Sequence, residues 1–399
     1  MTPHDDDTEQ LGAEPGEIAG AVPIDARRTA AGEHHRQRLQ PGISRFWNVG
    51  PMVESAVSAR VFTRNPINRF PGDSMFKTQT PIRRRSVVLG AIGAASLALT
   101  PLARAQQKFI NVLTGGQSGV YYPLGVALSQ IYGKVLPDAK VTVQSTKASA
   151  ENLNLLQAGR GEIALTLGDA LSDAWNGDKE AGFNTPLKKL RAVAGVYANY
   201  IQIVANADAG IKTMADLKGK RISVGAPKSG TELNARAILK AAGLSYSDFA
   251  KVEYLAFGES VELMKNRQLD VTLQSAGLGV SSIRDLSTSV KIIVVPIPAD
   301  VVAKVGDAAY QPSIIPANTY TGQTTDVPTA AIKNFLVSHE GVPADVVYLM
   351  TKSMFENLDT LVAAHAAAKG IKKEGATTGT PVPFHAGAEK YYREVGLMK

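Results

Sequence analysis

The sequence contains no cysteine among its 399 residues. A chain without thiols has no disulfide bonds, no thiolate metal sites, no cysteine nucleophile and no N-terminal cysteine that could carry a lipid. Histidine is scarce as well. Beyond residue 105 there are only His339, His365 and His385, which lie apart in the C-terminal third. The sequence therefore gives no support to an enzyme with a histidine base.

The mostly apolar run at residues 87–99 is only thirteen residues long, which is too short to cross a membrane. A membrane span needs ~20 such residues. The run follows Arg83-Arg84-Arg85 and precedes Ala103-Arg104-Ala105, an order typical of a secretory signal peptide. The arginine pair also resembles a twin-arginine signal, although a Sec signal would look similar. We expect residues 75–105 to be this signal and the mature protein to be periplasmic, without a lipid anchor.

Residues 1–74 show no sustained hydrophobic period of either 3.6 or 2. A signal peptide that began at Met1 would be several times longer than the usual ~15 to 30 residues. Our hypothesis is that translation starts at Met75 and that residues 1–74 are a non-native extension. The alternative is a real, disordered extension.

Charge and nucleotide motifs exclude further classes of function. The formal net charge is +7, and part of the positive surplus lies in the first 105 residues. Without a basic cluster in the mature chain, we expect no nucleic-acid partner. The glycine loops have neither the Gly-Lys-Ser or Gly-Lys-Thr ending of a Walker motif nor a GxGxxG pattern, so we expect no cofactor.

A small-residue loop, Thr114-Gly115-Gly116-Gln117-Ser118-Gly119, follows the apolar residues 109–113 and precedes a helical pattern. Pro123 sets the helix start near residues 119–121. The first amides of a helix have no partner within the helix, and glycines let a ligand approach them closely. This loop therefore predicts an anion site.

The same arrangement recurs about a hundred residues later. A strand at 221–225 leads through Ala226-Pro227-Lys228-Ser229-Gly230-Thr231 into a helix over 232–242. One such loop could serve turn geometry alone, and its hydroxyls could simply cap a helix. Two copies indicate two lobes that offer helix N-termini to one ligand.

The strand and helix patterns alternate, which favours an α/β fold with a parallel sheet in each of two lobes joined by a hinge. We expect residues 106–199 and 297–399 to form lobe I and residues 200–296 to form lobe II. Two strands over 190–197 and 200–205 would make the passage between them. Residues 327–399 have the pattern of a mostly helical segment.

Several motifs run in the same order through residues 108–397. They are Thr114-Gly115-Gly116, Tyr121-Tyr122-Pro123-Leu124-Gly125, Glu151-Asn152-Leu153, Asp216-Leu217-Lys218-Gly219-Lys220, Val224-Gly225-Ala226-Pro227, Ser229-Gly230-Thr231, Phe355-Glu356-Asn357-Leu358 and Ala388-Glu389-Lys390-Tyr391-Tyr392. With these motifs the chain resembles the TAXI family, the solute receptors of tripartite ATP-independent periplasmic (TRAP) transporters. The resemblance implies a type II periplasmic-binding-protein fold, capture of a small carboxylate and delivery to a permease driven by an ion gradient.

Two departures bear on the ligand. Lys147-Ala148 stands where the family often has glycines, and Gly168-Asp169 stands where it often has a Ser-Asp pair. The ligand can therefore differ from the glutamate-like or 2-oxoacid-like solutes of relatives.

We predict that a small anionic solute, a carboxylate or an amino acid, is held between the lobes of a monomer that works with TRAP permease subunits. The expected ligand-binding residues are Gly115, Gly116, Ser118, Gly119, Tyr122, Ser145, Asn152, Asp169, Ser229, Gly230, Thr231, Gln274 and Ser275. Tyr122 is favoured over Tyr121. Asp169 would hold an ammonium group or only favour its own helix start.

Other roles stay open at this point. Lys147 and Lys228 would supply charge at the cleft or be solvated. A secreted hydrolase or transferase would need Asp169 to meet Glu259 or Ser260. A ligand-sensing partner of a membrane sensor would use the same cleft. We expect Gly230 to lie in a surface loop, where replacing it with aspartate would leave the fold intact.

Overall fold

The computed structural model describes residues 108–399. Its first half contains β1 (Lys108–Leu113), α1 (Tyr121–Val135), β2 (Ala139–Gln144), α2 (Ser149–Gln157), β3 (Ile163–Leu167), α3 (Gly168–Asn176), β4 (Leu190–Asn206), η1 (Ala207–Ala209), η2 (Met214–Leu217), β5 (Arg221–Ser223), α4 (Gly230–Ala241) and η3 (Tyr246–Asp248). Then follow β6 (Lys251–Glu253), α5 (Phe257–Lys265), β7 (Val271–Ala276), α6 (Ser281–Ser289), β8 (Ile292–Val295), α7 (Ala299–Lys304), β9 (Gln311–Ile315), β10 (Val327–His339), α8 (Ala344–Glu356), α9 (Leu358–Ala364), η4 (Ala366–Gly370) and α10 (Ala386–Glu394).

The strands form a mixed sheet in the order β2-β1-β3-β10-β4-β7-β5-β6, with β8 on β4 and β9 on β10. β1 pairs in parallel with β2 and β3, and β5 pairs in parallel with β6 and β7. The two central strands, β4 and β10, run antiparallel to their neighbours. The parallel arrangement expected for the two lobes is thus present at the two ends of the sheet.

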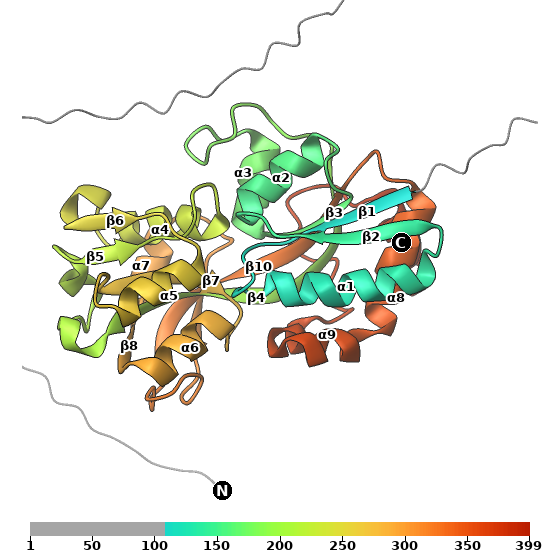
Figure 1. Cartoon of the computed structure of the whole chain (residues 1–399). Helices are drawn as coiled ribbons and strands as arrows, with labels where there is room; N and C mark the ends of the chain where they lie inside the picture. Colours follow the sequence, from blue (N-terminus) through green and yellow to red (C-terminus); the bar gives the residue numbers. More distant parts are fainter. Residues whose placement is uncertain (1–107) are drawn as a thin grey trace, which may run out of the picture. The chain divides into compact units, whose positions relative to one another are not determined.

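Two long strands connect the lobes (Figure 1). β4 pairs with β10 between residues 190 and 200, and its last part pairs with β7 over 200–205. β10 makes the reverse passage, from β9 at its start to β3 at its end. The fold is therefore a two-lobed α/β architecture of the periplasmic-binding-protein type.

Two expectations about these strands are wrong. Residues 190–206 form one continuous strand, where we expected two strands separated at Asn199. Residues 327–339 form β10, although the pattern had indicated helix. β10 is buried along almost its whole length, so it lacks the alternation of apolar and polar residues that marks a half-exposed strand.

The expected lobe boundaries stay a prediction, and the return passage suggests where lobe II ends. α7 contacts α4, and β9 pairs with the first residues of β10. We therefore propose that residues 297–326 belong with lobe II and that the chain returns to lobe I within β10. The predicted segments 1–74 and 75–105 lie outside the described residues.

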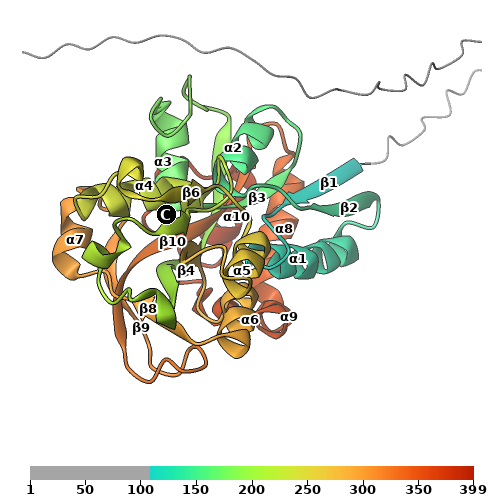
Figure 2. The same cartoon turned by 60° about the vertical axis from the view of Figure 1, so that its left-hand side comes forward.

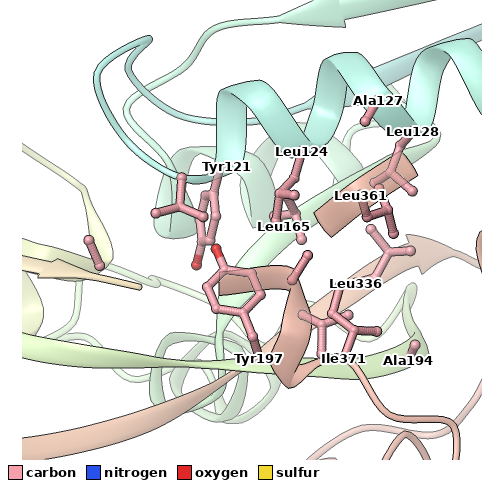
Figure 3. Packing of buried hydrophobic residues seen from close by; sticks show 14 of the residues in the cluster. Tyr121, Leu124, Ala127, Leu128, Leu165, Ala194, Tyr197, Leu336, Leu361 and Ile371 are labelled. Atoms are coloured by element: carbon pink, nitrogen blue, oxygen red, sulfur yellow. The ribbon is translucent and has the colours of Figure 1, made fainter. Parts of the chain in front are cut away.

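Helices cover both faces of the sheet and bury one core on each. Alternate residues of one strand point to opposite faces, so Val112 joins the core under α1, α8 and α10 while Leu113 joins the core under α2, α3 and α4. Figure 3 shows part of the first core, where Leu124 and Leu128 of α1 lie near Leu336 of β10. This packing fixes the helix starts around the site.

Candidate functional site

A cavity of about 120 Å³ lies between the lobes. An engineered protein cavity of about 150 Å³ holds one benzene molecule, so this space suits a small solute. Its wall is formed by Gly115, Gly116, Gly119, Val120, Tyr121, Thr146, Lys147, Ala148, Ser149, Leu167, Tyr197, Asn199, Ala226, Ser229, Gly230, Thr231, Ala256, Phe257, Ser275 and Ala276.

The first turns of four helices meet at this cavity. They belong to α1 and α2 of the first lobe and to α4 and α5 of the second. Figure 2 shows α5 beside the start of α1. Helix N-termini carry partial positive charge and unpaired amides. Among the lining residues the one charged side chain is the exposed Lys147, and none is acidic. The cavity is therefore suited to an anion.

Hydrogen bonds hold the first glycine loop against α2. The Thr114 carbonyl oxygen accepts from Asn152 Nδ2 at 2.7 Å and from Thr146 Oγ1 at 2.8 Å. Ser145 Oγ donates to the Gly115 carbonyl at 2.9 Å. Asn152 and Ser145 were expected to contact the ligand, but neither lines the cavity. Both instead fix the loop that does.

The second loop is fixed by a helix cap and a tight turn. Ser229 Oγ accepts from the Glu232 amide at 3.1 Å and so caps α4. Gly225 has a φ of 95°, which only glycine adopts readily, and a Cβ there would lie 2.7 Å from Thr231 Cγ2. Ser229, Gly230 and Thr231 all line the cavity, as does Ser275. The structure thus brings together these four predicted residues with Gly115, Gly116 and Gly119.

Tyr121, and not Tyr122, lies in the wall. Its hydroxyl donates to Asn334 Oδ1 at 2.5 Å, and Asn334 Nδ2 donates to Asn199 Oδ1 at 2.8 Å. Tyr122 is half-buried and outside the lining. The favoured tyrosine is therefore one position away from the residue that the helix turns toward the cavity.

Tyr197, Thr146 and Asn199 line the cavity although the sequence reasoning singled out none of them. The passage between the lobes was predicted over 190–205, so Tyr197 and Asn199 could have been identified from their position at the middle of that passage. In Figure 3 the Tyr121 side chain extends from α1 and the Tyr197 side chain from β4, and their hydroxyl groups point into the space between these two elements. Burial raises the pKa of both phenols far above the ordinary value, which keeps them neutral.

Three other predicted residues lie away from the cavity wall. Asp169 Oδ2 accepts from Asn234 Nδ2 at 2.5 Å and from Tyr310 Oη at 2.8 Å, so it connects α3 of the first lobe with the second lobe. Gln274 Oε1 accepts from Ser282 Oγ at 2.6 Å. The Ser118 carbonyl accepts from Ser281 Oγ at 2.9 Å at the rim.

Gly230 is buried at a contact between the lobes. A Cβ built there would lie 2.6 Å from Ser149 Oγ and from Leu167 Cδ1. The expectation that Gly230 lies in a tolerant surface loop is therefore wrong. Any side chain at this position would press the first turn of α4 against the first lobe.

The acid/base set considered for an enzyme does not assemble around the cavity. Asp169 is engaged between the lobes, Glu259 accepts from the Ala256 amide at 3.1 Å, and Ser260 Oγ lies 2.7 Å from Ser223 Oγ. Within residues 108–399 no group of three or more histidine or acidic side chains is placed to hold a metal ion. In that same range, no helix combines the length and hydropathy needed to span a membrane.

Solved structures with a similar fold include the periplasmic aliphatic sulphonate binding protein SsuA from Escherichia coli, with 17% identity, a TM-score of 0.37 and coverage of 66% of this chain and 80% of that chain. PhnD1 from Prochlorococcus marinus, solved with methylphosphonate, has 12% identity, a TM-score of 0.47 and coverage of 73% and 100%. A putative L-cystine ABC transporter from Listeria monocytogenes has 15% identity, a TM-score of 0.42 and coverage of 68% and 98%. Likeness at this level does not bear on the ligand.

The family comparison is more specific than these structural similarities. The model of the NMT1-like family matches residues 112–396, which include both glycine loops, the two connecting strands and α10. This match spans nearly all of the described chain. The protein therefore belongs to the NMT1-like family.

Proposed function

We propose that this protein is an extracytoplasmic receptor that captures a small carboxylate between its lobes and hands it to a membrane permease. The observation that carries the proposal is the cavity itself, where the first turns of α1, α2, α4 and α5 meet and no lining side chain is acidic. Backbone amides at helix starts bind anionic oxygens without a nearby basic side chain.

The wall residues belong to both lobes, which supports capture of the ligand through lobe closure. Gly115, Gly116 and Gly119 belong to the first lobe, and Ser229, Gly230 and Thr231 belong to the second. A ligand that contacts both sets binds the closed arrangement more tightly than the open one. It shifts the equilibrium toward closure by this difference in binding free energy. The hinge would lie where β4 and β10 pair across the passage, at 198–200 and 331–333.

A thermal-shift screen tests the capture of an anion. Small carboxylates added in excess should raise the melting temperature, because a ligand at a hundred times its dissociation constant adds roughly 2.7 kcal/mol of apparent stability. Small amines and uncharged polyols of the same size should not. If the amines stabilise the protein and no carboxylate does, the proposal is wrong.

The transport partner that we propose is a TRAP permease. Support comes from the motifs shared with the TAXI family and from the signal-like segment 75–105. Deletion of the gene in its native host should abolish uptake of the captured acid. That uptake should collapse when the ion gradient is removed while ATP is maintained. Uptake that depends on ATP alone would contradict the TRAP assignment and leave capture untouched.

A further inference from the structure

Two buried hydroxyl groups in the cavity wall lack a hydrogen-bond partner among the described residues. They are Tyr197 Oη, from the hinge strand β4, and Ser275 Oγ, from β7 of the second lobe. Tyr197 is 2% exposed and Ser275 is 5% exposed. A buried polar group without a partner destabilises the folded protein, and such groups are rare in native structures unless they serve a purpose.

The neighbouring polar groups are already paired. Tyr121 Oη donates to Asn334 Oδ1, and the side-chain Nδ2 of Asn199 donates to the Ser275 carbonyl oxygen at 3.0 Å. The hydrogen bonds of Tyr121, Asn199 and Asn334 form one connected network. Tyr197 Oη, from β4, and Ser275 Oγ, from β7, are therefore the two wall hydroxyls with neither a donor nor an acceptor partner among the described residues.

Tyr197 also lines two hollows besides the ligand cavity. Its ring borders the ligand cavity, a small apolar void beneath α1, and a separate hollow behind the hinge strands. Gly277 lies so close to the ring that a Cβ there would be 3.2 Å from Tyr197 Cε2, and a Cβ at Gly370 would be 3.2 Å from Tyr197 Cβ. The phenol is thus held in one place, with a fixed ring and an unused hydroxyl group.

We propose that Tyr197, assisted by Ser275, determines specificity by recognising an uncharged oxygen on the ligand. This inference rests on the proposed function, because the helix starts hold the carboxylate while the two hydroxyls hold the second group. Hydroxyls of serine and tyrosine both donate and accept, which suits a hydroxyl or carbonyl oxygen. An ammonium group would find no acidic partner in the wall.

The test compares matched acids of three and four carbons by calorimetry. Propanoate is compared with its 2-hydroxy and 2-oxo derivatives, and butanoate with its 3-hydroxy and 4-hydroxy derivatives. We expect the parent protein to bind at least one oxygen-substituted acid about tenfold more tightly than its unsubstituted partner, which is one hydrogen bond of ~1.4 kcal/mol. Tyr197→Phe should abolish this preference, so that the substituted and unsubstituted acids bind with about equal affinity.

Tyr132→Phe is the matched control. Tyr132 is fully buried in α1, its hydroxyl also lacks a partner, and it does not line the cavity. Both substitutions remove one unpaired buried hydroxyl, but only Tyr197→Phe should remove the preference. If Tyr197→Phe keeps it, or the parent binds both members of every pair equally, the inference is overturned while anion capture stands. If no acid binds the parent, the proposed function itself fails.

Discussion

Gly116 is the glycine of the first loop where added charge is easiest to interpret. It is exposed, and a Cβ there would meet no atom within 4 Å. Gly116→Asp should therefore fold like the parent but place a carboxylate where an anion is expected. We expect it to lose the ligand-induced rise in melting temperature, which corresponds to roughly 2.7 kcal/mol at a hundredfold excess over the dissociation constant.

Gly133→Asp provides the control for this substitution. Gly133 also has free space around it, and it lies near the far end of α1, the helix that follows the first loop. It introduces the same charge ~20 Å away, since a helix rises 1.5 Å per residue. Gly133→Asp should keep the full ligand shift. A full shift in Gly116→Asp as well would show that the first loop does not hold the anion.

At the scale of single residues, the sequence could predict the loops but not which side chain faces the ligand. Ser229 was identifiable because a hydroxyl residue before a helical pattern is a frequent cap. Tyr121 and Tyr122 are adjacent in the sequence, and a helix turns by about 100° per residue. Choosing between them requires the exact packing of α1, which only the folded structure supplies.

The first turns of α4 and α2 meet across the cleft at Gly230 and Ser149. Gly230→Ala adds one methyl group that would lie 2.6 Å from Ser149 Oγ and Leu167 Cδ1. The closed arrangement should therefore be disfavoured, whereas each lobe should keep its own fold. We expect carboxylate affinity to fall by tenfold or more and the radius of gyration with saturating ligand to exceed that of the parent.

Gly258→Ala tests whether any methyl group at the cleft has this effect. A Cβ at Gly258, in the first turn of α5, would lie 3.4 Å from Ser118 Oγ, an ordinary contact distance. Its affinity should stay within about threefold of the parent. Equal losses in both variants would mean that the clash at Gly230 does not control closure.

The carboxylate of Asp169 links α3 to α4 and to Tyr310 when the lobes are closed. Burial raises the pKa of Asp169 to about 6, whereas its ordinary value is 3.8. The closed form then binds more protons than an open form with a solvated Asp169, so closure is favoured as pH falls through 6. Carboxylate affinity should rise on the order of tenfold between pH 7 and pH 5.

Neighbouring acids need separate control in this experiment. Asp173 of α3 has its pKa raised to about 7 by burial and by Asp169, Asp178 and Asp307. Asp169→Asn should flatten the pH dependence, while Asp173→Asn should keep the rise centred near pH 6. Calorimetry at several pH values measures this directly, and an unchanged rise in Asp169→Asn would rule out Asp169 as its source.

At the scale of elements, the sequence pattern could predict the helices and the short strands, but not the long central strands β4 and β10. β1 and β3 are short, mostly apolar runs that lead into a loop or a helix. β10 contains Lys333 and Asn334 in its middle, and it is placed by pairing with β3 and β4, which lie more than a hundred residues earlier. Such long-range pairing leaves little trace in the local pattern.

The whole molecule should become more compact when it binds a carboxylate. Both lobes contribute to the cavity wall and are joined by two strand passages, a geometry that permits hinge closure. Small-angle scattering should show a smaller radius of gyration at saturation than without ligand. An unchanged radius with confirmed saturation would mean that the lobes do not move.

The central claim is that helix starts from both lobes hold a small carboxylate in the cavity between them. Mass spectrometry of compounds released by denaturing freshly purified protein tests this claim most directly, since a captured solute remains chemically unaltered. We predict an acid of about three or four carbons that carries an uncharged oxygen and no amino group. Release of a cationic compound, or of an acid that the protein converts during incubation, would contradict the account.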